Sequence, residues 1–516
     1  MSGGQYLSDL DFIDPLGSNR EVVRSMGYAV VDLLVDHFST LAERPVFSGI
    51  TPDNMGALLS EILPEQGKSY QDVLGECRDR VISHSMFFGH PNYVGHMITQ
   101  PTVMAIFADA LTAALNQSVF LWEVGPAAAH LEVEVIRWFA KLFGLGEQSG
   151  GTFVSGGTVA NLTAILVARN FKLLIDVGRE GLTSPKLRQT PVFFASENCH
   201  FSVQKVASFA GLGTDNLILI RSDEDGRMST ADLRAKIGNA RTAGELPFCV
   251  VATAGTTVAG HIDPLPAIEQ ICREEDLWFH IDAAHGGALA FSSSRARLLE
   301  GISKADSITF DAHKWLYMSI PASMVLFQNA SMLKQYLYFK APYVVDLPSL
   351  AGKRLNQGEM TVQGTRRFDA LKIWLSLKHL GSRHFGAMVD RTVELAHYMF
   401  SRVEASDDLE ACAPVTMNIC CFRYNPKAMR KRKNNLGEGT QRQVETFLDN
   451  LNVLLQKRLE GSGQGFISIS TFQGKKVLRA IIHNRCIQKA NIDYIVNEVR
   501  HLGRTVYEER KEDLPI

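Results

Sequence analysis

The chain has 516 residues, of which 46% are hydrophobic and 21% are charged. This is the composition of an ordinary folded protein, and the length is sufficient for a large core and more than one domain. Its 53 Lys and Arg residues nearly balance 55 Asp and Glu residues, which gives a net charge of −2. No broad attraction to nucleic acid or to an anionic membrane is therefore expected.

The cysteine pattern and the N-terminus indicate the compartment. The eight cysteines include no CxxC pair, so reduced thiols in a cytoplasmic protein are expected rather than a zinc ribbon or a disulfide framework. Residues 1–16 are acidic and lack the basic and apolar regions of a signal peptide. The most apolar long window, residues 103–122, contains Asp109, Asn116 and Gln117, which predicts a core or interface helix rather than a membrane span.

The first half of the chain changes from helical to alternating patterns. Apolar residues at spacings of three and four predict helices in residues 20–85, and two more helices are predicted over 100–115 and 127–142. Short β-rich runs then alternate with helical patterns from about residue 150 to 330. The predicted strands cover residues 192–196, 216–220, 248–255, 277–284, 307–314 and 324–329. This alternation predicts an α/β fold with a mostly parallel central sheet covered by helices.

The second half begins with a segment that has no clear periodicity, residues 340–365, which is predicted to be a long loop near a binding site. The last hundred residues predict a smaller α+β unit, in which the basic run 427–435 is expected to be a solvated turn. We therefore predict three units: an N-terminal helical segment over residues 1–85, a large domain over 86–385, and a small C-terminal domain over 386–516.

Four polar side chains follow predicted strands: His200, Thr257, Asp282 and Lys314. The carboxyl ends of parallel strands meet at one edge of a sheet, where ligands bind. A lysine near cationic or desolvating groups has a lowered pKa and can form a Schiff base. A buried carboxylate needs a partner, and one such partner is a protonated ring nitrogen, as in pyridoxal phosphate.

Each of these residues also has a structural explanation. A lone lysine is most often a surface side chain, and a lone histidine more often has a structural role. The glycines before Thr158 suit a phosphate at a helix N-terminus, although Thr158 also suits a plain helix cap. A metal site is a further alternative, but the spacing of its candidate ligands matches neither HxxxH nor HExxH. Those candidate ligands are His280, Asp282, His285 and His313.

Five motifs, SGGT, NCHFSVQKVA, TAGTTVAGHIDP, HIDAAHGG and DAHKW, occur in this order. Together they resemble the group II pyridoxal-phosphate-dependent amino-acid decarboxylases, and the resemblance covers nearly the whole chain. The segments around DAHKW and TRRF are most similar to L-2,4-diaminobutyrate decarboxylases. The resemblance implies fold type I, the aspartate-aminotransferase-like fold of pyridoxal-phosphate-dependent transferases. It also implies a homodimer that exchanges its N-terminal helices and shares its active sites.

The resemblance assigns roles to individual residues. Lys314 would hold pyridoxal 5'-phosphate as a Schiff base, Asp282 would pair with the pyridine nitrogen, and His200 would stack on the ring; these three are the implied catalytic residues. The other implied cofactor contacts are Gly157, Thr158, Thr257, Ala284 and His313. Arg479 would meet a carboxylate of the substrate. His96 and Trp122 are candidates for the substrate pocket, with core packing as an equal alternative.

The proton donor and the substrate stay open. Aromatic-type members carry a tyrosine in the loop before RRF, whereas here no tyrosine occurs between Val344 and Phe368, and Tyr343 lies at the start of the loop. His200 is then a candidate donor, and slow protonation followed by reaction with oxygen would make the protein an aldehyde synthase. Diaminobutyrate would require a carboxylate such as Glu123.

The segment LWEVGPA also resembles members that act on acidic substrates, and Phe120 and Trp122 suit an aromatic pocket. A non-catalytic protein with the same fold is the remaining alternative. The intact set of lysine, aspartate and histidine argues against it.

Overall fold

The computed structural model describes residues 17, 19–340, 355–433 and 435–514. Its larger sheet has seven strands in the order β2-β8-β7-β6-β5-β3-β4. Strands β3 to β7 run parallel, and β8 runs antiparallel to both β7 and β2. The strands are β2 (Gly150–Val154), β3 (Pro191–Ser196), β4 (Leu217–Ile220), β5 (Leu246–Thr253), β6 (Trp278–Asp282), β7 (Ser307–Asp311) and β8 (Ser323–Phe327). The predicted α/β fold with a mostly parallel sheet is confirmed.

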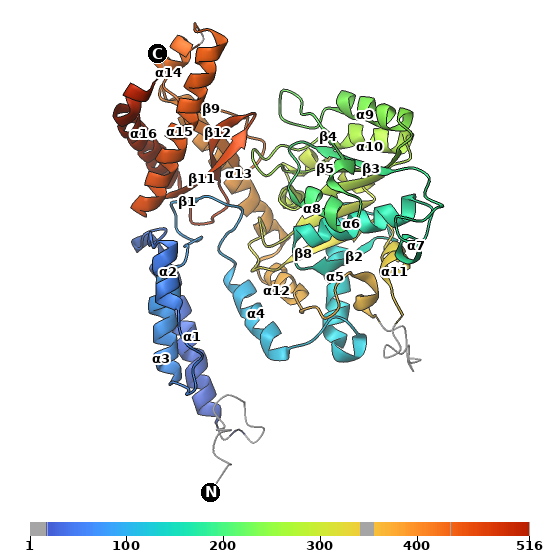
Figure 1. Ribbon diagram of the computed structural model, residues 1–516. Helices are drawn as coiled ribbons and strands as arrows, with labels where there is room; N and C mark the ends of the chain where they lie inside the picture. Colours follow the sequence, from blue (N-terminus) through green and yellow to red (C-terminus); the bar gives the residue numbers. More distant parts are fainter. Residues whose placement is uncertain (1–16, 18, 341–354, 434, 515–516) are drawn as a thin grey trace.

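The central strands are covered by helices on both faces (Figure 1). All residues of β6 and β7 are buried, which is why they read as nearly continuous apolar runs. Phe279, Ile281 and Phe310 pack in one core cluster, and Trp278 packs in another with residues of α6 and β3. The helices of this part are α4 (Val103–Leu115), α5 (Pro126–Leu142), α6 (Gly157–Lys172), α7 (Val177–Glu180), α8 (Ser202–Phe209), α9 (Thr230–Thr242), α10 (Leu265–Glu274), α11 (Ser331–Leu337) and α12 (Ala370–Leu380).

The C-terminal part contains a second sheet of five strands in the order β1-β11-β12-β10-β9. Its neighbouring strands are antiparallel, except that β1 runs parallel to β11. The strands are β1 (Tyr93–Val94), β9 (Leu409–Ala411), β10 (Ile419–Tyr424), β11 (Phe466–Phe472) and β12 (Lys475–Ile481), and the helices are α13 (Ser382–Glu404), α14 (Lys427–Lys433), α15 (Glu438–Ser462) and α16 (Lys489–Arg510). Because β1 comes from before α4, the chain contributes to this sheet twice. The unit boundaries at residues 85 and 385 stay a prediction.

The basic run after β10 is not a solvated turn. The prediction is wrong for residues 427–433, which form the seven-residue helix α14. Met429 is buried beneath it, Lys433 pairs with Glu445, and Arg430 donates to the carbonyl oxygen of Leu409 at 2.9 Å. These partners offset the repulsion between neighbouring cations that made a helix unexpected.

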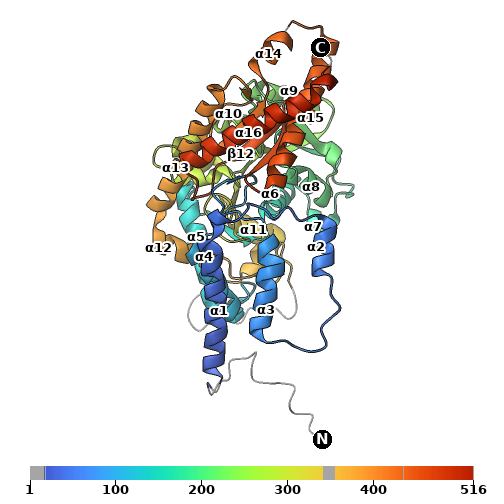
Figure 2. The same ribbon diagram turned by 90° about the vertical axis from the view of Figure 1, so that its left-hand side faces the viewer.

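The N-terminal segment is helical, as predicted, and extends away from the small sheet as an arm (Figures 1 and 2). Its helices are α1 (Arg20–Ser39), α2 (Pro52–Leu59) and α3 (Tyr70–Glu76), and none of the three contains a buried residue. Several large apolar side chains of α1 are exposed, among them Tyr28 and Val35. Among the helices that the structure describes, none combines the length and apolarity needed to cross a bilayer.

A buried ion pair fixes the segment that enters α12. Arg366 donates to both carboxylate oxygens of Glu132 at 2.8 and 2.9 Å and to the carbonyl oxygen of Phe153 at 3.0 Å. The two side chains are only 5% and 1% exposed. The guanidinium thereby links α5, the end of β2 and the chain before α12.

Replacing Arg366 by methionine should lower the free energy of unfolding by about 3–5 kcal/mol, because Glu132 would keep a buried charge without a partner. The double variant Arg366→Met/Glu132→Leu should recover most of that loss, since no buried charge then remains unpaired. Urea unfolding of the three proteins measures the difference. A single variant as stable as the wild type would contradict this account of the pair.

Candidate active site

Lys314 lies just beyond the end of β7 and is paired there. Its Nζ is 3.0 Å from Oδ2 of Asp311, the last residue of the strand. The Asp311 side chain is 2% exposed and that of Lys314 is 22% exposed. Burial raises the pKa of Asp311, but the Lys314 ammonium and the His313 imidazole outweigh it and hold the pKa below its usual value. The lysine is therefore held at the strand end in a largely buried ion pair.

Asp282 ends the neighbouring strand β6, where it lies in register with Thr309 of β7. Its carboxylate is 6% exposed and accepts hydrogen bonds from Nδ2 of Asn161 at 2.9 Å and from the Ala284 amide at 3.1 Å. Both donors are neutral, and no ion pair of Asp282 occurs among the described residues. A buried carboxylate in such surroundings is stabilised by a cation from a ligand, such as a protonated ring nitrogen.

The N-terminus of α6 forms an anion-binding position next to these residues. The N-cap residue of α6 is Gly156, which has no side chain to accept a hydrogen bond from the first turn. The amides of Gly157 and Thr158 have no acceptor in the described part of the chain. A Cβ built on Gly156 would meet nothing within 4 Å, whereas one on Gly157 would lie 2.9 Å from Oδ2 of Asp311. Free helix amides facing open space suit a phosphate, and Gly157 brings them close to Asp311.

Two histidines flank this position. His200 accepts at Nδ1 from the Ser202 amide at 3.3 Å, and its Nδ1 is 2.8 Å from the Ser202 hydroxyl oxygen. His313 accepts at Nδ1 from the Ala322 amide at 3.2 Å, and its Nε2 lies 3.8 Å from Oδ2 of Asp311. Burial lowers the pKa of both imidazoles. Both nitrogens named Nδ1 face a backbone N–H, which can only donate, so in the neutral rings the proton lies on Nε2.

Arg479 reaches this region from the small sheet. The residue lies on β12 and is 8% exposed. Its Nε donates to the Ser468 hydroxyl at 3.0 Å, and its Nη1 donates to the carbonyl oxygen of Thr257 at 2.9 Å. Its Nη2 lies 3.4 Å from Nδ1 of His96. Burial lowers its pKa, although a guanidinium stays charged in proteins. Within the described ranges no carboxylate lies in ion-pair distance of Arg479, so the charge of this buried cation has no anionic partner there.

The described contacts of Trp122 and its neighbours lie with another part of the chain. Trp122 and Glu123 lie in a turn between α4 and α5, where the Trp122 amide donates to Oδ1 of Asn356 at 3.1 Å. The neighbouring carbonyl oxygen of Phe120 accepts from the Gly358 amide at 2.9 Å. None of the contacts described for this turn involves Lys314 or Arg479. Tyr343 lies outside the described residues.

Three side chains at the site were not predicted: Asn161, Ser202 and Asp311. Asn161 follows Gly157 by four residues, so it lies on the same face of α6 one turn further on. That spacing is the one signal in the sequence that points to it. Ser202 carried no signal beyond its place two residues after His200.

The four candidate metal ligands make hydrogen bonds to groups that are not metal ligands. His280 contacts Ser307 at Nδ1 and Asn161 at Nε2, and His285 contacts Asn418 at 2.8 Å while stacking on Trp315. No group of three or more His, Cys, Asp or Glu residues positioned for a metal ion occurs among the residues that the structure describes.

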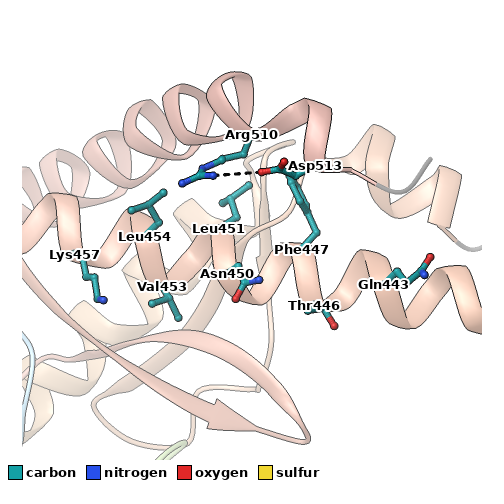
Figure 3. A pocket seen from close by; sticks show the side chains of 10 residues that line it. All are labelled: Gln443, Thr446, Phe447, Asn450, Leu451, Val453, Leu454, Lys457, Arg510 and Asp513. Atoms are coloured by element: carbon teal, nitrogen blue, oxygen red, sulfur yellow. Dashed lines mark hydrogen bonds and ion pairs between the residues drawn. The ribbon is translucent and has the colours of Figure 1, made fainter.

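A groove of about 640 Å³ lies between α15 and the end of α16, and none of these residues lines it (Figure 3). Its charged side chains include Arg510 and Asp513, which face each other at 3.5 Å, and Lys457. It contains no histidine, cysteine or buried carboxylate. The carboxyl edge of the seven-stranded sheet is therefore the candidate site.

The arrangement of this edge fits pyridoxal phosphate. It offers an amine for the aldehyde, a buried carboxylate for the ring nitrogen and free helix amides for the phosphate. These three groups come from β7, β6 and the start of α6, which are held by one sheet.

Comparison with known proteins agrees with this fit. Residues 52–425 match the model of the pyridoxal-dependent decarboxylase conserved domain. The chain is 30% identical to an aromatic-L-amino-acid decarboxylase of Bacillus atrophaeus, over 94% of this chain and 96% of that protein. It is 31% identical to human cysteine sulfinic acid decarboxylase, over 96% of this chain and 100% of that protein.

The crystal structure of mouse CSAD in apo form superposes with a TM-score of 0.86 at 30% identity, covering 94% of this chain and 99% of that one. The predicted family and fold type are thus confirmed. The chain belongs to the pyridoxal-dependent decarboxylases and is a carboxy-lyase that acts on an amino acid with pyridoxal phosphate as its cofactor.

Proposed function

We propose that the protein decarboxylates an L-amino acid with an acidic side chain, using pyridoxal phosphate attached to Lys314. The observation that carries this proposal is the proximity of the Lys314 amine, the Asp282 carboxylate and the free amides of α6 at one sheet edge. When bound, the cofactor supplies an electron sink that stabilises the negative charge left at Cα as CO₂ departs.

The residues of the chain would hold the cofactor and control a proton. Asp282 would accept a hydrogen bond from the ring nitrogen and keep that nitrogen protonated. The amides of Gly157 and Thr158, with the Nε2–H of His313, would bind the phosphate. Thr257 and Ala284 would line the ring position, and His200 would cover it and supply a proton at Cα from Nε2.

Arg479 would bind a carboxylate of the substrate. It is a buried guanidinium whose described partners, Ser468, Thr257 and His96, are all uncharged, because burial also lowers the pKa of His96. A substrate carboxylate that reaches the Arg479 guanidinium forms a charge-assisted hydrogen bond at a position from which most water is excluded.

The charges near Lys314 favour an acidic substrate. Asp282 is assigned to the ring nitrogen of the cofactor and Asp311 pairs with Lys314, so in the described part of one chain no further carboxylate at this edge awaits a second ammonium. Arg479 adds a cation. L-2,4-diaminobutyrate is the alternative and would require Glu123, whose described backbone neighbours lie away from this edge, to come from a partner subunit.

A second copy of the chain would cover the arm and one face of α4. Four apolar side chains recur at a spacing of four on α4 and are exposed: Val103, Phe107, Leu111 and Leu115. The exposed apolar residues of α1 add to this surface. We propose a homodimer in which Trp122 and Glu123 belong to the pocket of the partner.

The cytoplasm is the proposed location. All eight cysteines are free, and burial raises the pKa of several thiols, including those of Cys249 and Cys420. Free thiols, several of them buried and unreactive, suit a reducing compartment.

The purified protein should show a visible absorbance band, and Lys314→Ala should abolish both the band and CO₂ release. Asp282→Asn should keep the band but lower kcat by about 10²–10³-fold, the usual cost of removing one preorganised electrostatic contact. Asp232→Asn, which neutralises a buried carboxylate on α9 that pairs with Arg221, should leave kcat unchanged. Full activity of Lys314→Ala would exclude the proposed attachment.

Arg479→Met should lower kcat/KM by about 30-fold or more, mostly through KM, because about 2 kcal/mol or more is lost when one partner of a buried charge pair is removed. Arg479→Lys keeps the charge but lacks the planar guanidinium, so its kcat/KM should lie between those of the wild type and Arg479→Met. The absorbance band should be the same in both variants. Unchanged substrate kinetics of Arg479→Met would show that the carboxylate binds elsewhere.

A substrate panel of cysteine sulfinate, aspartate, glutamate, the aromatic amino acids and diaminobutyrate should give the highest kcat/KM for an acidic member. CO₂ release is the measurement. Oxygen uptake measured in parallel tests the aldehyde-synthase alternative, which the lack of a tyrosine between Val344 and Phe368 favours. A preference for diaminobutyrate would contradict the electrostatic argument. Consumption of one oxygen molecule per CO₂ released would show that the product is an aldehyde and not the amine.

The double variant Phe107→Glu/Leu111→Glu should turn a dimer into a monomer in sedimentation velocity and should remove activity. Charged side chains in the middle of an apolar contact remain desolvated and unpaired. Leu174→Glu, at a residue 92% exposed after α6, is the matched control. A monomeric wild type with full activity would overturn the shared site.

A further inference from the structure

We propose that Asn161 is a positioning residue that joins two parts of the site: it holds the Asp282 carboxylate and, by donating to the Ser202 hydroxyl, orients the O–H that Ser202 donates to Nδ1 of His200. This inference rests on the proposed roles of Asp282 and His200. Asn161 itself is 2% exposed and lies on α6, beneath the helix amides proposed to bind phosphate.

The alternation of β6 explains why α6 meets these groups. Successive side chains of a strand point to opposite faces, so Trp278, His280 and Asp282 share one face while Phe279 and Ile281 share the other. The residues Phe279 and Ile281 belong to one core cluster, and Trp278 belongs to the cluster that contains α6. Three side chains that can form hydrogen bonds therefore lie in a row along the face that α6 covers, and the row ends at Asp282.

Asn161 makes three contacts at that end of the row. Its Nδ2 lies 2.9 Å from Oδ2 of Asp282 and 2.9 Å from the Ser202 hydroxyl oxygen, and its Oδ1 lies 3.1 Å from Nε2 of His280. A carboxylate can only accept, so the NH₂ group of Asn161 must face Asp282. The oxygen of the amide then faces His280, whose Nε2 must carry a proton.

The far end of the row is fixed as well. Nδ1 of His280 accepts from the Ser307 hydroxyl at 2.9 Å, and the Ser307 oxygen accepts from the Trp278 indole at 2.9 Å. An indole N–H can only donate. With a pure donor at one end and a pure acceptor at the other, every proton between Trp278 and Asp282 has one direction, and all of them strengthen the hold on the Asp282 charge.

The branch toward His200 is equally determined. The Ser202 oxygen accepts one N–H of Asn161, so its own O–H is free to donate to Nδ1 of His200 at 2.8 Å. The Ser202 amide also donates to this nitrogen at 3.3 Å. Nδ1 of His200 is thus an acceptor, and the proton that His200 has to offer is on Nε2.

Few side chains can take the place of Asn161. It supplies two N–H donors and one acceptor at the length of a single methylene group. Aspartate keeps the acceptor for His280 but turns both donors into acceptors, which places two carboxyl groups at hydrogen-bond distance. Two such groups share one proton instead of both being ionised.

The test compares holoenzymes of the wild type, Asn161→Asp and Asn452→Asp. Asn452 is a fully buried asparagine on α15 whose amide contacts backbone groups of Tyr424 and Leu448, so it controls for burying an extra carboxyl group away from the site. Asn161→Asp should raise the dissociation constant of pyridoxal phosphate by about 10- to 100-fold, the usual cost of losing a hydrogen bond to a buried charge. Asn452→Asp should bind the cofactor as the wild type does.

A spectroscopic readout separates positioning from general damage. In Asn161→Asp the pH at which the visible band titrates should rise, because a carboxyl pair that shares a proton stabilises the charge on the ring nitrogen less, and the imine then holds its own proton more tightly. The same titration curve in Asn161→Asp and the wild type would overturn the inference. A wild type without any visible band would instead refute the proposed function itself.

Ser202→Ala keeps the inference testable if Asn161→Asp does not fold. It removes the hydroxyl that orients His200, while the Ser202 amide still donates to Nδ1 of His200 and Asn161 still donates to Asp282. Cofactor affinity and the titration of the band should therefore stay at wild-type values while kcat falls about 10-fold at unchanged KM. Wild-type kcat would overturn the link to His200. Loss of cofactor affinity in Ser202→Ala would show that Ser202 serves Asp282 rather than His200, which also contradicts the branch.

Discussion

The carboxyl ends of β6 and β7 place two buried carboxylates next to each other, and the site depends on how each is stabilised. Asp282 is held by the neutral donors Asn161 and Ala284, whereas Asp311 is held by the ammonium of Lys314. Burying charge is costly unless it is matched. The difference in partners separates the two roles, because only Asp282 keeps its charge available for a cation that a ligand brings.

The second sheet completes the site from the other side. Arg479 on β12 reaches the loop after β5 through Thr257, so the guanidinium spans the junction between the two sheets. His285, three residues after the end of β6, contacts Asn418, the residue before β10, at 2.8 Å. The strand-end chemistry of the large sheet and the cation of the small sheet are therefore held in one arrangement by polar contacts that leave little freedom between them.

Much of the fold could be predicted from the sequence where an apolar run has turn residues on both sides or where the pattern recurs along the chain. Strands β3 to β8 were predicted because each is an apolar run bounded by turn residues. Strand β2 was missed because it begins with two glycines, and β1 and β9 were missed because they have only two and three residues. The helix α14 was missed because its charge repulsion is offset by acids distant in the chain, such as Glu445.

The site was predictable to the same degree. Lys314, Asp282 and Gly157 follow from strand ends and a glycine before a helix, and the structure places them together. Asn161 and Ser202 act through contacts with residues 121 and 41 positions apart, and no local pattern encodes such contacts. The proposed pocket roles of Trp122 and Glu123 could not be derived, because under that proposal they depend on a second chain.

The most direct measurement is the position of the covalent attachment. The holoenzyme is reduced with borohydride and digested, and the peptide that carries the pyridoxyl group is identified by mass spectrometry. The account predicts a single modified peptide, with the group on Lys314. A pyridoxyl group on another lysine, or on none, would contradict it.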